Sequence, residues 1–206
     1  MDYEHQVPLE IEQNFLIPDD IEARLDSLKA VKVKELKLCD VYLDTASNCL
    51  VLSDMWLRRR NGNYELKYPP QNKMGSDVDQ YQETADKCLI EQLVFKQLAH
   101  SLSNSKMPKS LEELVPFMEL TTYRKEYRLG DNISIVLDET NYGYNIGEVE
   151  VISLTPETQQ QGVEEVERAI ADLRVQTVGR AEGKTMHYLA KFNSPLLDKI
   201  RSKLKF

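Results

Sequence analysis

The chain has 206 residues, a net charge of −8 at neutral pH, 41% hydrophobic residues and 29% charged residues. This composition is that of an ordinary globular protein and excludes a disordered or fibrous chain. The acidic balance argues against non-specific nucleic-acid binding, which needs a cationic surface, and no apolar run approaches the roughly 20 residues that cross a bilayer. The length fits one domain over residues 1–206.

The first half of the chain contains more strand-like than helical patterns. Strands are expected at Leu9–Leu16, Lys32–Thr45, Cys49–Arg60 and Asn63–Tyr68. A helix is expected after Pro18 and a second over Thr84–Leu102, with a proline- and glycine-punctuated loop from Pro69 to Asp79 between strand and helix. Asn61-Gly62 carries the turn signal of a hairpin.

The second half begins with a short helix, LEELVPF (Leu111–Phe117), for which Ser110 and Glu113 form a capping box. Strands are then expected at Glu119–Leu129, Ile133–Asp138 and Asn145–Leu154, and helices at Glu157–Val175, Thr185–Lys191 and Ser194–Lys205. Ser194-Pro195 has the residue types of an N-cap and first helical position. Strands joined by hairpins predict an antiparallel α+β fold.

Charged residues recur two apart along several of these strands, so they share a face of the sheet. Glu10 and Glu12 form one such pair, Arg58 and Arg60 a second, and Glu148 and Glu150 a third. One interpretation is a sheet with a single solvated face. The other is a closed sheet whose charged faces turn inward, where carboxylates hold a hard cation such as Mg²⁺ and arginines hold phosphate oxygens.

The sequence also contains a series of short blocks in a characteristic order. They are EIEQNF (Glu10–Phe15), DVYLDT (Asp40–Thr45), DMWLRRR (Asp54–Arg60), YELKYP (Tyr64–Pro69), TYRKEYRL (Thr122–Leu129), VLDETNYGYNIGEVEV (Val136–Val151) and EGKTMHYL (Glu182–Leu189). The ordered set covers nearly the whole chain and resembles the CYTH superfamily, the triphosphate tunnel metalloenzymes. Within that superfamily the blocks are most similar to the animal thiamine triphosphatases.

The resemblance implies an eight-stranded antiparallel closed barrel, a triphosphate tunnel, with flanking helices. It implies Mg²⁺, with Mn²⁺ as the alternative, and a small-molecule triphosphate as the only partner, with neither nucleic acid nor membrane. The implied reaction is metal-dependent hydrolysis of thiamine triphosphate to thiamine diphosphate. We expect a monomer, and the three cysteines without CxxC spacing, together with an N-terminus that lacks a signal peptide, favour a reduced, cytoplasmic compartment.

The resemblance also assigns roles to individual residues. The metal would be held by carboxylates, namely Glu10, Glu12, Asp138, Glu148 and Glu150. The phosphates would be held by cations, namely Arg58, Arg60, Lys67, Arg124 and Lys184. Trp56 would lie against the thiamine moiety, and Tyr42 with Lys67 would form a catalytic pair that activates water or steers the phosphate. These acids and bases are equal in number, so the net charge of −8 describes the outer surface and not the site.

One position departs from the superfamily pattern, because Asn14 stands where the ExExK signature has its lysine. Three alternatives to thiamine triphosphate hydrolysis stay open: an inorganic tripolyphosphatase, a triphosphate-binding module without catalysis, and an adenylate cyclase, which the blocks typical of thiamine triphosphatases favour least. A further possibility is that Lys34 or Lys125 compensates for the missing charge. The segment GRAEGKT (Gly179–Thr185) resembles a phosphate-binding P-loop but has one residue too few between its glycines and lacks the βαβ context.

Overall fold

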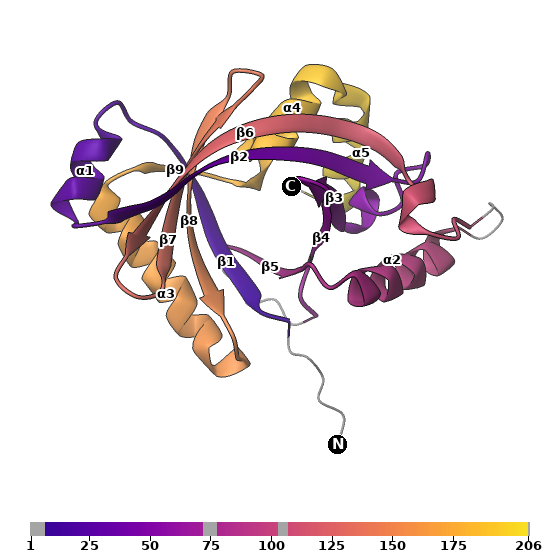
Figure 1. Ribbon diagram of the computed structural model, residues 1–206, viewed down its shortest axis with the longest axis horizontal. Helices are drawn as coiled ribbons and strands as arrows, with labels where there is room; N and C mark the ends of the chain where they lie inside the picture. Colours follow the sequence, from indigo (N-terminus) through magenta and orange to yellow (C-terminus); the bar gives the residue numbers. More distant parts are fainter. Residues whose placement is uncertain (1–6, 72–77, 103–106, 206) are drawn as a thin grey trace.

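Eight antiparallel strands close into a barrel in the computed structural model, which describes residues 7–71, 78–102 and 107–205 (Figure 1). The strands are β1 (Leu9–Leu16), β2 (Val31–Asp44), β3 (Trp56–Arg60), β4 (Asn63–Tyr68), β5 (Asp79–Thr84), β6 (Val115–Leu129), β7 (Ile133–Thr140), β8 (Asn145–Ser153) and β9 (Gln176–Val178). The helices are α1 (Ile21–Ser27), α2 (Lys87–Ser101), α3 (Pro156–Leu173), α4 (Lys184–Phe192) and α5 (Ser194–Leu204), with 3₁₀ turns η1 (Val51–Ser53), η2 (Leu111–Glu113) and η3 (Arg180–Glu182). The predicted eight-stranded barrel with flanking helices is confirmed.

Strand β1 closes the barrel. The strands follow the order β5-β4-β3-β2-β6-β7-β8-β1, and β1 also pairs with β5 through Leu9–Glu12. Beyond that pairing, β1 has room on the same side for the short strand β9, which pairs with Asn14–Leu16. Strand β9 leads directly into η3 and α4, so closure also brings the segment that carries Lys184 to the barrel.

The hydrophobic core lies outside the barrel, beneath the helices. Helix α3 packs on β1, β7 and β8 (Figure 1), where Phe15 and Val166 are fully buried. Helices α4 and α5 cover Met118 on the β6 side, and α2 covers Leu66 of β4. Because the apolar faces of the strands turn outward to the helices, their charged faces turn inward. The sequence interpretation in which those faces were solvated therefore does not apply to this barrel.

Two of the predicted secondary-structure elements are wrong in part. The expected strand Cys49–Arg60 begins only at Trp56, because Val51–Ser53 forms a 3₁₀ turn. The buried Asp44 carboxylate accepts hydrogen bonds from the amides of Leu50 and Val51 at the start of this turn. The expected helix LEELVPF is only the 3₁₀ turn Leu111–Glu113, and Ser110 makes no side-chain cap. Strand β6 begins directly afterwards, because its long pairing with β2 outweighs a weak local helical preference.

Other differences lie at the ends of elements. Strand β5 was not expected, and most of the loop predicted between Pro69 and Asp79 lies outside the described residues. Helix α5 begins where predicted, but its N-cap is Asn193 rather than Ser194. The Asn193 Oδ1 atom accepts a hydrogen bond from the Leu196 amide. No helix in the described part of the chain is long and apolar enough to cross a lipid bilayer.

The close contact between Phe15 and Gly147 makes a stability prediction. These residues face each other across β1 and β8, and a Cβ at position 147 would lie 2.1 Å from the Phe15 ring. Gly147→Ala is therefore expected to lower the free energy of unfolding by about 1–3 kcal/mol through overpacking, measured by chemical denaturation. Gly162→Ala is the control, because there the one close approach of the Cβ, 2.6 Å, is to Cδ1 at the end of the Ile11 side chain, its distance to Val151 is an ordinary 3.6 Å, and alanine favours the helix. A Gly147→Ala protein as stable as the wild type would contradict this packing.

Candidate functional site

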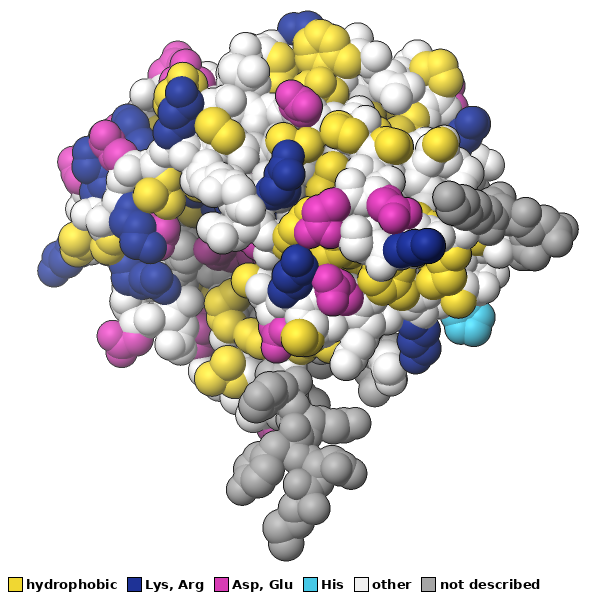
Figure 2. All heavy atoms as spheres, turned by 45° about the vertical axis from the view of Figure 1, so that its right-hand side comes forward, with side chains coloured by type: hydrophobic (Ala, Val, Ile, Leu, Met, Phe, Trp, Pro, Cys, Tyr) yellow, Lys and Arg dark blue, Asp and Glu magenta, His cyan; other side chains and the backbone are white. Residues whose placement is uncertain are grey.

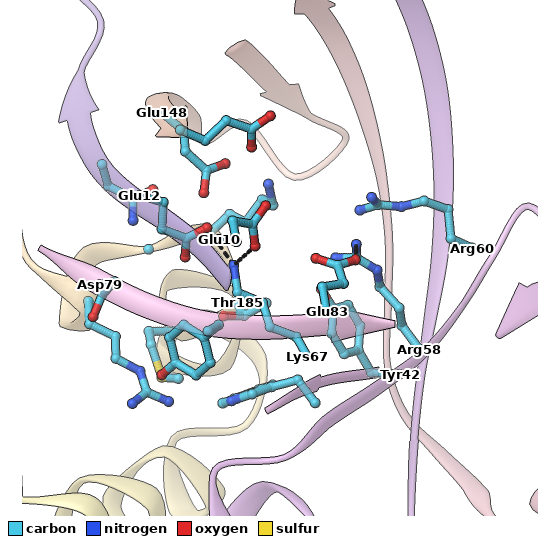
Figure 3. A pocket seen from close by; sticks show the side chains of 18 of the residues that line it. Glu10, Glu12, Tyr42, Arg58, Arg60, Lys67, Asp79, Glu83, Glu148 and Thr185 are labelled. Carbon is cyan, nitrogen blue, oxygen red and sulfur yellow. Dashed lines mark hydrogen bonds and ion pairs between the residues drawn. The ribbon is translucent and has the colours of Figure 1, made fainter. Parts of the chain in front are cut away.

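Charged side chains of both signs line a cavity of ≈ 340 Å³ that is walled by the strands of the barrel and the start of α4 (Figure 3). All but one of the predicted site residues lie in its lining. These are Glu10, Glu12, Tyr42, Trp56, Arg58, Arg60, Lys67, Arg124, Glu148, Glu150 and Lys184. The exception is Asp138. Their chemical roles stay predictions.

Strand alternation brings these residues to one space from distant parts of the sequence. Residues opposite each other in the ladder share a face, and Glu12 pairs with Glu150 while Arg58 pairs with Tyr42 and Glu65. Arg58 is only 11% exposed and Glu12 only 6%. Charges buried to this degree need partners of opposite sign close by.

The ammonium group of Lys67 lies between two glutamates of β1. Its Nζ is 2.5 Å from Oε2 of Glu12 and 2.8 Å from Oε2 of Glu10, and Figure 3 shows the lysine reaching towards both carboxylates. Burial alone would lower the pKa of Lys67, but attraction to Glu10 and Glu12 outweighs it, so the pKa lies well above its usual range. Lys67 therefore stays charged while it occupies the centre of the acidic group.

The glutamates of β1 and β8 lie so close together that the nearby cations do not keep all of them ionised. Burial raises the pKa of Glu12 well above its usual value, and Glu12 forms a hydrogen bond with Glu148. Burial also opposes ionisation of Glu148, but Lys184 and the bond from Glu12 outweigh it and lower the pKa of Glu148 to about 2. Burial and the nearby charge of Glu148 raise the pKa of Glu150 to about 7. The cluster thus holds protons that a cation would displace.

Asp138 does not line this cavity but pairs with two cations that do. It is 1% exposed, and its two oxygens accept bonds of 2.7 and 2.8 Å from Nε and Nη2 of Arg124. The Lys184 ammonium is 2.6 Å from the second oxygen. Burial works against the charged form of Asp138, but Lys184 and Arg124 outweigh it and hold its pKa well below the usual range. In this arrangement Asp138 fixes two cations that line the cavity.

The arginines of β3 are held in the same way. Arg60 donates to both oxygens of Asp40 on β2, at 2.7 and 2.8 Å, and Asp40 is 1% exposed. Arg58 contacts Glu65 at 2.7 Å and Glu83 at 2.5 Å. Burial would raise the pKa of Glu83, but Arg58 and Lys67 lower it to about 2. The bidentate pair with Asp40 fixes the guanidinium plane of Arg60. Arg58 is instead held by two separate carboxylates, those of Glu65 and Glu83.

Sequence reasoning missed the contribution of β5 and of η3. The alternate residues Asp79, Tyr81 and Glu83 of β5 line the cavity, as does Arg180 at the start of η3. In β5 a period-two pattern is present, but both faces are polar apart from Tyr81, so no apolar face identified a strand. Arg180 lies in the GRAEGKT segment, which resembles a P-loop, and its position in the cavity lining was not predicted.

Neither Lys34 nor Lys125 is placed to compensate for the lysine that Asn14 replaces. They do not line the cavity; they are exposed, and they pair with Glu126 and Glu22, respectively. Asn14 itself does line the cavity, next to Gly183. With Arg180 included, the acidic and basic side chains of the lining are equal in number. Figure 2 shows basic and acidic side chains interspersed on one outer face.

The donor set suits a divalent metal ion, although the side chains are not arranged around one. Among the described residues no group of three or more acidic, histidine or cysteine side chains is placed to hold a metal ion. Yet Glu10, Glu12, Glu148 and Glu150 all line one cavity, and carboxylate oxygens are the ligands of hard cations. The Glu10 Oε2 atom is buried and lies near Lys67 without a hydrogen-bonding angle. The chemistry of these residues therefore fits Mg²⁺ or Mn²⁺.

A family model and two named relatives match most of this chain. The model of the CYTH domain family matches residues 8–182. Over 196 residues the chain is 28% identical to proteins named thiamine-triphosphatase from Homo sapiens and Macaca fascicularis, covering 89% of this chain and 85% of each relative.

Solved structures share the fold at lower identity. A Pyrococcus horikoshii OT3 protein is 18% identical, with a TM-score of 0.61, over 88% of this chain and 99% of the other. A Hippeastrum protein, named for adenylyl cyclase activity and described as having a dominant triphosphatase activity, is 21% identical, with a TM-score of 0.55, over 89% and 96% of the two chains. At these identities the likeness shows the barrel fold alone.

The raised pKa of Glu150 predicts how stability depends on pH. Between its usual value of 4.5 and about 7, the folded state keeps a proton that the unfolded chain loses, so the free energy of unfolding falls as the pH rises. Glu150→Gln removes this loss. In EDTA, the variant is expected to match the wild type near pH 5 and to exceed its unfolding free energy by about 2 kcal/mol at pH 8, measured by denaturation.

Glu167→Gln, at an exposed position of α3, is the matched control and should show no growing difference. A gap between Glu150→Gln and the wild type that stays constant from pH 5 to pH 8 would contradict the shifted titration.

Proposed function

The chain belongs to the CYTH domain family, and from that premise we propose that it is a metal-dependent triphosphatase whose substrate is thiamine triphosphate. The observation that carries the proposal is one cavity whose lining contains the five predicted cations and four predicted glutamates. Such a site can neutralise a polyphosphate and hold a hard cation beside it.

The cations bind and orient the triphosphate in this proposal. Arg58, Arg60 and Arg124 keep their guanidinium groups fixed by carboxylates and offer their remaining N–H groups to phosphate oxygens. Lys184 contributes a positive charge from the first turn of α4, anchored by Asp138. Because the cations are pre-ordered, little side-chain entropy is lost when the anion binds.

The glutamates Glu10, Glu12, Glu148 and Glu150 would hold Mg²⁺, with Mn²⁺ as the alternative. When bound, the metal ion would neutralise phosphate oxygens and polarise the phosphorus. Asp138, which the superfamily resemblance assigns to the metal, instead supports Arg124 and Lys184 in this proposal. Lys67, now between Glu10 and Glu12, is the cation nearest to the glutamates and would turn towards a phosphate oxygen.

The reaction is the transfer of the terminal phosphoryl group to water. The oxygen of water bonds to the terminal phosphorus, the bond from that phosphorus to the bridging oxygen breaks, and the diphosphate leaves. The proton of the attacking water passes to solvent or to an oxygen of the products. Tyr42 is 3% exposed and lies across the ladder from Arg58, where its hydroxyl, with Lys67, would orient the water and the phosphate.

Two observations support thiamine triphosphate over inorganic tripolyphosphate. Trp56 offers an aromatic surface in the cavity wall, 6.3 Å from the Tyr42 ring centroid, and aromatic faces attract cationic rings. The curated relatives also carry the name thiamine-triphosphatase. A tripolyphosphate has no group to occupy that surface.

A phosphate-release screen tests the proposed function. Thiamine triphosphate, tripolyphosphate and ATP are offered with Mg²⁺, with Mn²⁺ and with EDTA. We expect turnover of thiamine triphosphate that EDTA abolishes, and at least about a hundredfold loss of kcat in Glu148→Gln. The carboxamide keeps the shape of the side chain but gives up its charge.

Glu167→Gln, far from the cavity on α3, serves as the control and should keep wild-type turnover. Turnover in EDTA, or full activity in Glu148→Gln, would contradict the metal assignment. Tight triphosphate binding without any product would favour a non-catalytic binding module, consistent with Asn14 in place of a lysine.

A further inference from the structure

Asp54 lies just outside the cavity and accepts hydrogen bonds from side chains that form its wall. The Trp56 indole Nε1 donates to its Oδ1 at 3.1 Å. The Tyr81 hydroxyl is 3.2 and 3.1 Å from its two oxygens. Arg180 donates from Nη1 to Oδ2 at 2.9 Å and from Nη2 to Oδ1. Trp56, Tyr81 and Arg180 line the cavity, whereas Asp54 does not.

The three donors come from separate parts of the chain. Trp56 begins β3, Tyr81 lies in β5, and Arg180 begins η3, which leads into α4. Asp54 joins them from the end of η1, with a left-handed backbone (φ 62°) that turns the chain into β3. A single carboxylate therefore fixes the polar ends of two aromatic rings and one guanidinium group.

Charge and ring contacts continue from this carboxylate into the phosphate site. The Arg180 guanidinium lies 5.2 Å from the Tyr81 ring centroid, and the Lys67 ammonium lies 5.1 Å from the same centroid. Tyr81 thus adjoins one cation bound to Asp54 and one bound to Glu10 and Glu12. Movement of Asp54 would free the aromatic wall while leaving the Arg58, Arg60 and Arg124 ion pairs intact, since these have other carboxylate partners.

We propose that Asp54 is a positioning residue that sets the selectivity of the site for triphosphates carrying a planar organic group. It does so by holding the Trp56 indole and the Tyr81 ring as fixed surfaces of the cavity. The inference rests on the proposed function, because it concerns the non-phosphate part of the substrate of that same site. Asp54 itself does not touch the substrate.

The test compares KM and kcat for thiamine triphosphate and for tripolyphosphate in the wild type, Asp54→Ala and Asp54→Asn. Loss of a hydrogen bond to a charged group is worth about 1.5–3 kcal/mol, so Asp54→Ala is expected to raise KM for thiamine triphosphate by about tenfold or more. KM for tripolyphosphate should rise by a clearly smaller factor, because the Arg58, Arg60 and Arg124 ion pairs do not involve Asp54 and only Arg180 loses an ion pair with it. Asp54→Asn keeps an oxygen acceptor for the indole and should restore much of the selectivity.

Two further variants serve as a positive and a negative control. Trp56→Ala removes the surface itself and should show the same KM pattern as Asp54→Ala. Asp198→Ala removes an exposed aspartate of α5 and should match the wild type for both compounds. An equal rise of KM for both compounds in Asp54→Ala, or no rise for either, would overturn the proposal.

A second measurement does not depend on turnover. Trp56 is the sole tryptophan, so acrylamide quenching of its fluorescence reports the exposure of this one ring. Quenching should increase in Asp54→Ala and stay near the wild-type value in Asp54→Asn. Unchanged quenching in Asp54→Ala would mean that the carboxylate does not hold the ring, which would overturn the proposal.

Failure of the proposed function is distinguishable from failure of this inference. If the wild type releases no phosphate from either compound, the triphosphatase proposal fails. Dissociation constants for the same two compounds, measured by calorimetry in EDTA, then replace KM. A selective loss of thiamine triphosphate binding in Asp54→Ala would still support the positioning role, and an unselective loss or no loss would overturn it.

Discussion

Burial of cations inside a closed barrel is the constraint on which the rest of this structure depends. A cation taken out of water without a partner is too costly to persist, so each one in the cavity is matched by a carboxylate. Arg124 and Lys184 share Asp138, Arg60 has Asp40, and Lys67 lies between Glu10 and Glu12. Asp40 and Asp138 are deeply buried and do not line the cavity, so their ion pairs need not break when an anion binds. The glutamates of the lining would instead compete for these cations with any anion that enters.

The same constraint explains why the barrel is polar inside and apolar outside. Helices α2, α3 and the pair α4 and α5 cover the outer faces of the strands, so the hydrophobic contribution to stability arises outside the barrel. The interior is then available for charged side chains that destabilise the fold when they are not fully paired. The raised pKa values of Glu12 and Glu150 are the sign of that conflict. Burying these glutamates lowers the stability of the fold, and the same burial keeps their carboxylates in a cavity where a ligand can reach them.

Alternating charge indicated three pairs of the cavity lining, because a strand whose apolar face carries Ile11 and Phe15 carries Glu10 and Glu12 on the opposite face. The other predicted site residues, and all of the roles, came from the resemblance to the CYTH superfamily. Alternation failed for β5, where Gln80, Gln82 and Thr84 leave no apolar face to identify the strand. The sequence does not show how deeply a carboxylate lies, and Asp138, which the resemblance assigns to the metal, is 1% exposed and paired with Arg124 and Lys184. That depth depends on strand register, which only the folded barrel defines.

The central claim, that the glutamates of β1 and β8 hold a metal ion beside a bound triphosphate, is tested most directly by crystallography. Crystals grown with Mn²⁺ and tripolyphosphate are measured at the manganese absorption edge. The account predicts an anomalous peak within the cavity, ligated by oxygens from the group Glu10, Glu12, Glu148 and Glu150, with Lys67 turned away from Glu12 towards phosphate. A triphosphate bound in the cavity with no manganese peak among these glutamates would contradict it.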